Sequence, residues 1–256
     1  MSLTETTEYL RSADCPEVGT IAIDGQVIEY RRPRPLATAL ELIFGQRIYD
    51  VDTAPRVIID GGSWLGVSIL RFRTLFPGAR IIGFEPDPEI FAVLQRNLRQ
   101  NDATDGVTLV PAALAGVAGP RNFVATGSDS GSMHARVSGQ RMTVDCVRAS
   151  SYVTEPGTLL KLNIEGAECE VLEELGDQLS FVDQVLVEYH GFAELPQTLH
   201  RILSVLDGAG LTYIVSHFNE RNRACVPPLR IMPGYRYFLL IYARRMTGPI
   251  PQGEPR

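Results

Sequence analysis

The chain has 256 residues, of which 45% are hydrophobic and 21% charged, and its formal net charge is −6. A chain of this length can bury a large core without disulfides or metal ions, and its acidic balance argues against a nucleic-acid-binding protein, which usually carries a basic surface. No apolar run reaches the roughly 18 residues of a membrane span, and the N-terminus shows neither region of a signal peptide, so we expect a cytoplasmic protein without membrane spans.

We expect residues 1–54 to form an N-terminal extension that packs on the main domain. Within it, residues 19–32 place apolar side chains on both sides of an Asp-Gly pair, which predicts a β-hairpin, and a helix is expected near 36–44. The main domain is expected over 55–246. We expect residues 247–256, at the end of the chain, to form a loose tail.

From residue 57 onward, predicted strands alternate with predicted helices. Short apolar runs ended by turn residues predict strands at 57–61, 80–87, 107–114, 158–166, 182–190, 211–218 and 235–243. Helical spacing and cap signals predict helices over 66–76, 88–98, 168–175 and from Pro196 to Gly208 or Gly210. Repeated strand–helix units form parallel sheets covered by helices on both faces. The last two strands are joined without a helix, which predicts an antiparallel pair at one edge.

Residues 115–150 interrupt this alternation. They contain glycine- and serine-rich turns and two β-like pieces, 121–126 and 141–147. We interpret this stretch as an excursion that forms a flap over the sheet.

A glycine-rich turn follows the first strand of the alternating region, in the stretch VIIDGGSWLG at 57–66. Open parallel sheets bind ligands at the carboxyl ends of their strands, and the first strand–helix turn is the usual place. Glu85 ends the next strand, 25 residues after Asp60. An acidic residue at that position commonly binds ribose hydroxyls, so we expect a ligand that carries a ribose.

The glycine spacing favours a ligand without phosphates. A dinucleotide site usually reads Gly-x-Gly-x-x-Gly, whereas this turn reads Asp-x-Gly-x-x-x-Gly and contains the bulky Trp64. S-adenosylmethionine carries a ribose and no phosphate, and Asp60 is expected to meet its ammonium group directly or through water. An NAD(P)-dependent oxidoreductase, and a turn that is only a structural corner, are the alternatives at this point.

Four segments in order resemble the FkbM family of S-adenosylmethionine-dependent methyltransferases: VIIDGGSWLG, IIGFEPDPEIFAVLQRNLRQN, LLKLNIEGAECEVLEEL and VLVEYHG, over about residues 55–191. The resemblance implies a class I, Rossmann-like α/β fold with a seven-stranded, mostly parallel sheet, helices on both faces and an antiparallel last strand. It also implies O-methylation, often of sugar, polyketide or glycolipid hydroxyls in bacterial natural products. Two positions depart from the family pattern, which usually has Asn at Trp64 and Asp at Asn163.

The cofactor is expected to lie on the first turn and on the ends of the next two strands. The candidate cofactor-binding residues are Asp60, Gly61, Gly62, Ser63, Trp64, Gly66, Glu85, Pro86, Ala112 and Ala113.

Candidate catalytic residues follow from the ends of two neighbouring strands. Asn163 and Glu165 are two residues apart, as are Glu188 and His190, so each pair points to one side of its strand. His190 is the first candidate for the base that removes the acceptor's proton, and Glu165 is the second. Glu188 is expected to orient His190 or bind a substrate hydroxyl, and Asn163 to hold the acceptor or the cofactor amine. An ordinary strand-end histidine, and a glutamate that only stabilises a helix N-terminus, are the structural alternatives.

A divalent metal at this cluster is a second, less favoured interpretation. Asparagine, glutamate and histidine side chains can ligate such an ion, but Asn163 carries no charge where the family has Asp. The four cysteines show no zinc or redox spacing. No metal site is therefore predicted.

The acceptor is expected to be a hydroxylated small molecule, with no nucleic-acid partner. The loop 219–234 and the N-terminal extension are expected to shape its pocket. A scaffold that binds S-adenosylmethionine without catalysis is the main non-enzymatic alternative, and a homo-oligomer is left open.

Overall fold

The computed structural model describes residues 1–126, 131, 133, 139–192, 195–216 and 236–246. The predicted loop 219–234 and the predicted tail 247–256 therefore lie outside the described residues. The central sheet in the described part of the chain has seven strands: β3 (Val57–Gly61), β4 (Arg80–Phe84), β5 (Val107–Val110), β9 (Thr158–Leu162), β10 (Val182–Phe192), β11 (Leu211–Ser216) and β12 (Arg236–Arg245).

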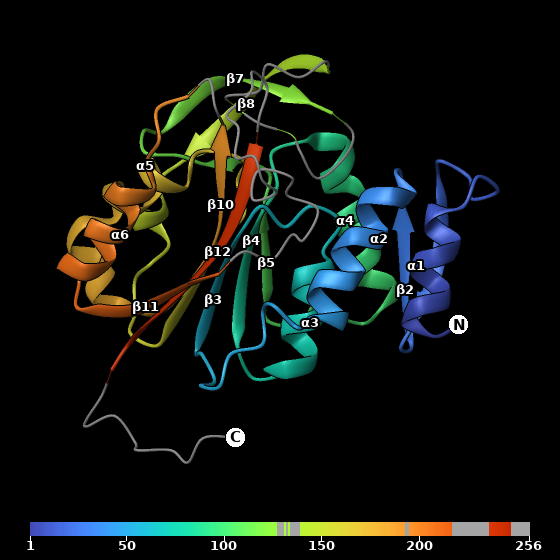
Figure 1. The fold of residues 1–256 in the computed structure, drawn as a ribbon, viewed down its shortest axis with the longest axis horizontal. Helices are drawn as coiled ribbons and strands as arrows, with labels where there is room; N and C mark the ends of the chain where they lie inside the picture. The colour runs from blue at the N-terminus through green and yellow to red at the C-terminus, as the bar shows by residue number, and fades with distance from the viewer. Residues whose placement is uncertain (127–130, 132, 134–138, 193–194, 217–235, 247–256) are drawn as a thin grey trace, which may run out of the picture.

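The strand order is β11-β12-β10-β9-β3-β4-β5 (Figure 1). The pairs from β10 to β5 are parallel, whereas β12 runs antiparallel to both of its neighbours. The predicted class I fold is thus confirmed, including the antiparallel last strand. Because β10, β9, β3 and β4 are adjacent and parallel, their carboxyl ends lie along the same edge of the sheet.

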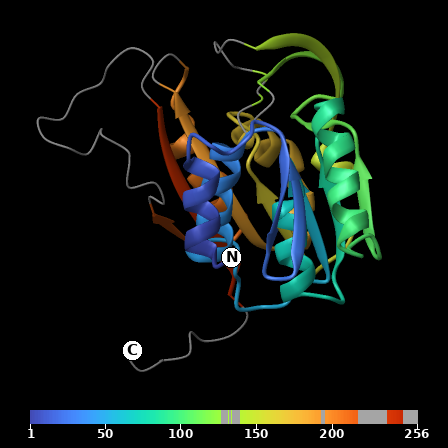
Figure 2. The same ribbon diagram turned by 90° about the vertical axis from the view of Figure 1, so that its right-hand side faces the viewer.

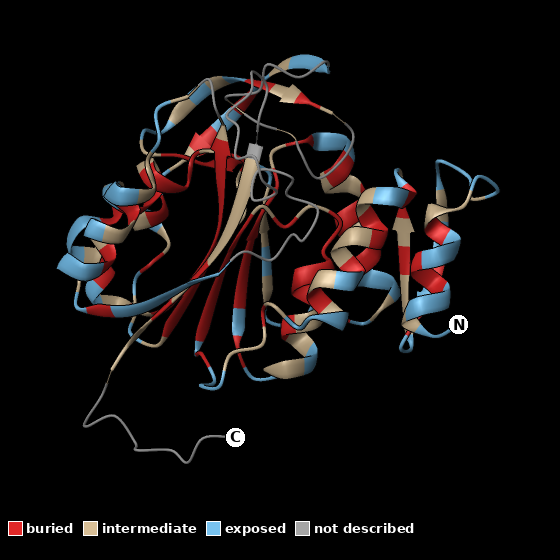
Figure 3. Ribbon diagram, in the orientation of Figure 1, coloured by how far each residue is buried: buried red, intermediate tan, exposed pale blue. Residues whose placement is uncertain are grey.

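Helices cover both faces of this sheet, and the two faces have separate apolar cores. The helices are α3 (Val67–Leu75), α4 (Pro88–Gln100), α5 (Glu168–Leu175) and α6 (Leu199–Gly208), with short 3₁₀ turns η2 (Ala149–Ser151) and η3 (Gly176–Phe181). Along β3, Ile58 joins the core under α3 and α4, and Ile59 joins the core under α5 and α6. Figure 3 shows the central strands buried between these layers, as expected for strands that read as continuous apolar runs.

Several predicted strands end earlier than expected. Strand β4 ends at Phe84, and the side chain of Asp87 accepts hydrogen bonds from the first turn of α4. The predicted strand 107–114 breaks after Val110, because Ala113–Leu114 (β6) pairs in another sheet. The predicted strand 158–166 ends at Leu162, and the turn beyond it contains Glu165 in a left-handed backbone with a φ of 55°.

The predicted flap contains a small second sheet, ordered β6-β8-β7, with β7 at Gly119–Ala125 and β8 at Gln140–Val147. It lies over the carboxyl edge of the central sheet (Figure 1). Its own core includes Phe123 and Cys146. Arg121 pairs with Glu170 of α5 at 2.9 Å, which ties the second sheet to the main domain.

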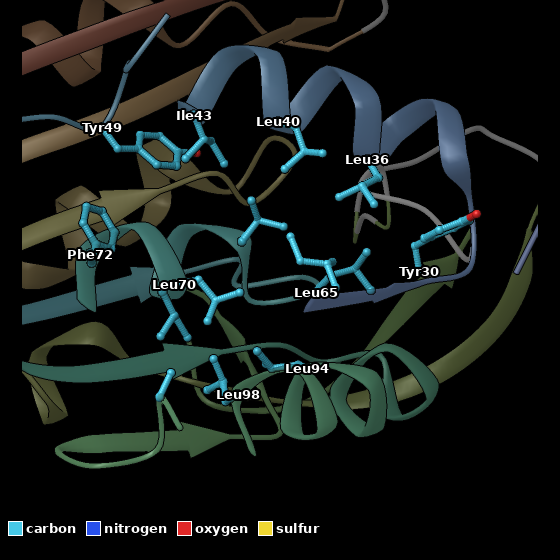
Figure 4. Close-up of a cluster of buried hydrophobic side chains, with 14 of the residues drawn as sticks. Tyr30, Leu36, Leu40, Ile43, Tyr49, Leu65, Leu70, Phe72, Leu94 and Leu98 are labelled. Atoms are coloured by element: carbon cyan, nitrogen blue, oxygen red, sulfur yellow. The ribbon is translucent and has the colours of Figure 1, made fainter. Parts of the chain in front are cut away.

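Residues 1–54 form two helices and a hairpin beside α3 and α4. The elements are α1 (Leu3–Arg11), β1 (Gly19–Ile23), β2 (Gln26–Tyr30), α2 (Pro33–Leu40) and a π-helical turn η1 (Glu41–Gly45). Helix α1 is missing from the sequence prediction. Figure 2 brings this segment to the front, and Figure 4 shows its apolar side chains packed on α3 and α4.

The hairpin is held on α4 by two asparagine side chains. Asn97 Oδ1 accepts a hydrogen bond from Glu29 N, and Asn101 Oδ1 accepts one from Val27 N, both at 2.7 Å. These contacts replace the missing neighbour strand of β2, so the N-terminal segment has a defined position. Across the described ranges, no helix combines the length and apolar character that a bilayer crossing needs.

Candidate active site

An open cavity lies at the carboxyl ends of β3, β4, β9 and β10, and its empty space, including solvent at the mouth, is about 1060 Å³. Its walls come from three directions: the strand-end turns of the central sheet, the N-terminal segment and the second sheet. This is the edge at which an open parallel sheet binds its ligand. Seven of the ten predicted cofactor-binding residues line it: Gly62, Ser63, Trp64, Glu85, Pro86, Ala112 and Ala113.

The three remaining cofactor candidates, Asp60, Gly61 and Gly66, do not line the cavity. The two glycines are needed by the protein's own packing. A Cβ added at Gly61 would lie 2.9 Å from Leu114 Cδ1, and one at Gly66 would lie 2.7 Å from Leu94 Cδ1. They allow the turn and α3 to pack closely, which a larger side chain would prevent.

Gly62 joins the cofactor turn to the turn after β9. Its φ is 77°, and an added Cβ would lie 1.9 Å from the carbonyl oxygen of Asn163. The amide of Asn163 in turn donates a hydrogen bond to the carbonyl of Gly61 at 3.1 Å. The predicted cofactor turn and the predicted catalytic turn are therefore in direct backbone contact.

Asp60 lies beneath the cavity, fully buried. Its Oδ1 is 2.9 Å from Lys161 Nζ, and its Oδ2 accepts a hydrogen bond from Ser68 at 2.6 Å. Lys161 also donates to the carbonyls of Gly61 and Gly62, at 3.1 and 2.8 Å. Asp60 thus supports the turn from below through Lys161, where the sequence had suggested a contact with the ligand's ammonium group.

Trp64 occupies the left-handed backbone region, with a φ of 46°. Asparagine adopts this conformation more readily than a bulky residue does, which accounts for the asparagine of the family pattern. The Trp64 amide donates to Glu85 Oε2 at 3.0 Å, and Trp64 is one of the residues that line the cavity. Its ring N–H has no hydrogen-bond partner among the described residues.

Glu85 is a buried carboxylate on the cavity wall, with 7% of its surface exposed. Besides the Trp64 amide, it accepts a hydrogen bond from the amide of Asp87 at 2.9 Å. Burial raises the pKa of Glu85 to about 8, against an ordinary value of 4.5. Each oxygen has accepted one amide, and a carboxylate can accept further donors.

Of the predicted catalytic residues, Asn163, Glu165 and Glu188 line the cavity and His190 does not. The prediction that Asn163 and Glu165 point to the same side of a strand is wrong, because both residues follow the end of β9 at Leu162. They are brought to the cavity instead by the turn at the left-handed Glu165.

His190 is enclosed by two carboxylates. Its Nε2 lies 3.1 Å from Glu165 Oε1, and its Nδ1 lies 2.9 Å from Glu168 Oε1. Burial lowers the pKa of His190, but the two carboxylates outweigh it and raise that pKa well above its ordinary value. A protonated imidazole with both nitrogens donating has no position at which to accept a proton. This geometry disagrees with the expected role of His190 as the base.

Glu188 does not orient His190, as the sequence had suggested, but accepts a hydrogen bond from the phenol of Tyr49. Burial raises the pKa of Glu188 and places that of Tyr49 well above its ordinary value. Lys161 Nζ lies 5.5 Å from the centre of the Tyr49 ring. Tyr49 and Lys161 also line the cavity, but the sequence did not predict them as site residues. The one signal for Lys161 was that a single lysine lies within a buried apolar strand.

In the part of the chain that the structure describes, no three histidine, cysteine or acidic side chains converge as metal ligands would. The buried His190, Glu165 and Glu168 are engaged with one another.

Residues 54–214 match the methyltransferase FkbM domain. The chain belongs to the FkbM methyltransferase family. It is similar to methyltransferase sdnD of Sordaria araneosa, with 28% identity over 185 residues that cover 57% of this chain and 71% of the relative. Methyltransferase 1 of Beauveria bassiana (strain ARSEF 2860) is 28% identical over 180 residues, covering 57% and 70% of the two chains.

Two solved structures have the same fold as this FkbM methyltransferase. TYW2 of M. jannaschii, crystallised with AdoMet, has a TM-score of 0.51 at 10% identity and covers 92% of this chain and 90% of its own. An FkbM methyltransferase of Methylobacillus flagellatus KT has a TM-score of 0.50 at 14% identity, with 83% and 54% covered. The family match places the chain among S-adenosylmethionine-dependent methyltransferases and not among nicotinamide oxidoreductases.

The residues of the cavity fit S-adenosylmethionine. Glu85 is a buried carboxylate with room for hydroxyl donors, which suits a ribose diol. The indole N–H of Trp64 is a donor without a partner among the described residues. Pro86, Ala112 and Ala113 form an apolar surface beside them, as an adenine ring requires. These residues would hold the cofactor in this FkbM methyltransferase.

Proposed function

We propose that this FkbM methyltransferase methylates a hydroxyl group of a small molecule. Sugar, polyketide and glycolipid hydroxyls of bacterial natural products are the acceptors that the family resemblance implies. When bound, S-adenosylmethionine supplies the electrophilic methyl group. The protein then has to position the hydroxyl and take up its proton.

The observation that carries the proposal is the buried carboxylate of Glu188 on the cavity wall. Burial raises its pKa, which makes it a stronger base than a carboxylate in water. It lies on β10, next to β9, whose end carries Asn163. We assign Glu188 as the proton acceptor, in place of His190, and the Asn163 amide as the group that orients the acceptor or the cofactor amine.

His190 is proposed to position the turn that carries Asn163 and Glu165. Its protonated ring joins Glu165 to Glu168. Glu168 in turn accepts hydrogen bonds from the amides of Ile164 and Gly166, at 3.3 and 3.0 Å. This network holds a turn that includes a left-handed glutamate, a conformation that is costly without support.

The first experiment measures binding and turnover separately. Trp64 is the only tryptophan of the chain and lines the cavity, so its emission should change when S-adenosylmethionine or S-adenosylhomocysteine binds. Turnover is followed by release of S-adenosylhomocysteine with a panel of alcohols, phenols, glycosides and amines. Mass spectrometry and NMR of the product should place the new methyl group on oxygen.

The decisive variant is Glu188→Gln. Loss of a general base should lower kcat by roughly 10²- to 10⁴-fold, with the affinity for S-adenosylhomocysteine nearly unchanged. Glu8→Gln, at an exposed position of α1, is the matched control and should keep wild-type kcat. EDTA should leave turnover unchanged if no metal takes part.

Two outcomes would contradict the proposal. Methylation of amines but of no hydroxyl would assign a different acceptor atom. Cofactor binding without transfer to any compound of the panel would favour the scaffold alternative.

A further inference from the structure

Part of the cavity wall belongs to the N-terminal segment, ahead of the matched FkbM domain. Leu42, Ile48 and Tyr49 line the cavity, and the domain match begins at residue 54. We call these three side chains the apolar wall. Leu42 and Ile48 are half-buried and Tyr49 is buried.

The apolar wall is held in a defined turn. Leu42 lies in the π-helical turn η1, and its carbonyl accepts a hydrogen bond from the amide of Ile48 at 3.2 Å. Asp50 follows the wall and pairs with Arg71 of α3, whose Nε lies 2.8 Å from Asp50 Oδ1. Short π-helical turns are frequent at functional sites. The wall is therefore a built surface rather than a loose strand of chain.

Tyr49 brings the apolar wall to the acceptor end of the site. Its phenol donates to Glu188 on β10, whereas the ribose-binding candidate Glu85 follows β4. In the sheet order, β9 and β3 separate β10 from β4. Tyr49, the last residue of the wall, therefore contacts the proposed proton acceptor, on a strand that is separated by two others from the strand before Glu85.

The chemistry of the wall suits an apolar acceptor. A sugar brings several hydroxyls, and each one buried without a partner is costly. Leu42 and Ile48 offer no hydrogen bonds, and the phenol of Tyr49 already donates to Glu188. An aliphatic or aromatic alcohol needs only one polar contact, and its hydrocarbon part gains by leaving water.

We propose that the acceptor is an apolar alcohol whose hydrocarbon part packs on Leu42 and Ile48 and whose hydroxyl reaches Glu188 beside Tyr49. The inference rests on the proposed function for the position of the reacting hydroxyl. It goes further by excluding free sugars as the preferred class and by assigning specificity to residues outside the family domain.

The test uses the full chain saturated with S-adenosylhomocysteine, so that the cofactor end is filled. The probes are 2-naphthol, followed by its own fluorescence, and methyl β-D-glucopyranoside, followed by calorimetry. The wild-type protein should bind 2-naphthol at least tenfold more tightly than the glucoside. Ile48→Gln and Leu42→Gln should each weaken 2-naphthol binding by about tenfold or more, in line with discrimination by apolar pockets.

Val18→Gln is the matched control. Val18 also belongs to the N-terminal segment, but it is exposed and lies outside the cavity lining. Its affinity for 2-naphthol should equal that of the wild type. Affinity for S-adenosylhomocysteine, measured in every variant, shows that the wall variants have folded.

The results separate this inference from the proposed function. Equal loss in the wall variants and in Val18→Gln, or glucoside binding as tight as that of 2-naphthol, overturns the inference. If glycosides are methylated and apolar alcohols are not, the inference fails and the proposed function stands. If 2-naphthol binds on the wall but no hydroxyl is ever methylated, the proposed function fails and the assignment of an alcohol acceptor fails with it, although the apolar wall still binds its probe.

Discussion

Lys161 and Asp60 form a buried ion pair beneath the cofactor turn, with Lys161 Nζ 2.9 Å from Asp60 Oδ1. The side chains are 2% and 0% exposed, so neither charge is solvated by water. Lys161 also donates to two carbonyls of the turn. The only lysine of the chain thus connects the charge below the turn to the backbone that is proposed to border the cofactor.

Lys161→Met should destabilise the protein strongly. Removing one partner of a buried ion pair leaves the other charge uncompensated and typically costs about 3–5 kcal/mol. Chemical unfolding measures the loss. The double variant Asp60→Asn, Lys161→Met should recover part of it, because no charge is then left buried. Strictly additive effects in the double-mutant cycle would show that the pair is not coupled.

Above about pH 8, where Glu85 is ionised, Glu85→Gln should weaken cofactor binding by roughly ten- to hundredfold, since hydrogen bonds to a charged group contribute about 1.5–3 kcal/mol. The emission of Trp64 reports the affinity. Glu8→Gln should bind normally. A variant with unchanged affinity would remove Glu85 from the ribose site.

The same Glu85→Gln variant should be more stable than the wild type without ligand. The pKa of Glu85 is about 8 in the folded protein, above its ordinary 4.5, so the folded state holds a proton that the unfolded state loses. Wild-type stability therefore falls as the pH rises from about 4.5 to about 8. The Tm advantage of the variant should be several degrees at pH 8 and should shrink toward pH 5.

His190 should stay protonated at neutral pH. Its pKa is raised well above 6.5 by Glu165 and Glu168, against the effect of burial. The stabilisation from this network is complete below about pH 6.5 and is lost as the pH rises through the folded-state pKa. Ring-carbon NMR shifts at pH 7.5 should be those of imidazolium, with the exposed His200 as a comparison signal in the same spectra. A neutral ring at that pH would return His190 to consideration as the base.

Gly62→Ala should damage both folding and cofactor binding. The added Cβ would meet the Asn163 carbonyl at 1.9 Å, in a backbone with a φ of 77°. Gly25→Ala separates the two effects, because Gly25 has a φ of 79° and no atom within 4 Å of an added Cβ. The control should cost only about 1–2 kcal/mol for the left-handed backbone, measured by urea unfolding. Similar losses at the two glycines would argue against close packing of the turns.

The parts of the fold with local signals could be predicted from the sequence. The apolar run of β3 ends in glycines, and Asp87 with Pro88 marks the start of α4. Helix α1 was missed although Ser2 and Glu5 form a capping box, because its apolar residues are few. The end of β9 was missed because an apolar run does not show where a non-glycine residue, Glu165, turns left-handed.

The candidate site was predictable only where sequence spacing determines position. Glu85 follows from its distance to the first turn, and it lines the cavity. The partner of Glu188 is Tyr49, 139 positions away, and no periodicity or motif relates them. His190 looked like a base because its sequence neighbours do not reveal Glu168, which reaches it from the first turn of α5.

The apolar wall precedes residue 54, whereas the residues proposed to hold the methyl donor follow it. Relatives that align only across the shared domain can therefore keep the same binding site for the methyl donor and differ in the acceptor that they methylate. Chimeras that exchange the first 53 residues between such relatives should exchange their acceptor specificity as well. Such chimeras would have to keep the two asparagine side chains of α4 that bind the hairpin, because these contacts position the N-terminal segment.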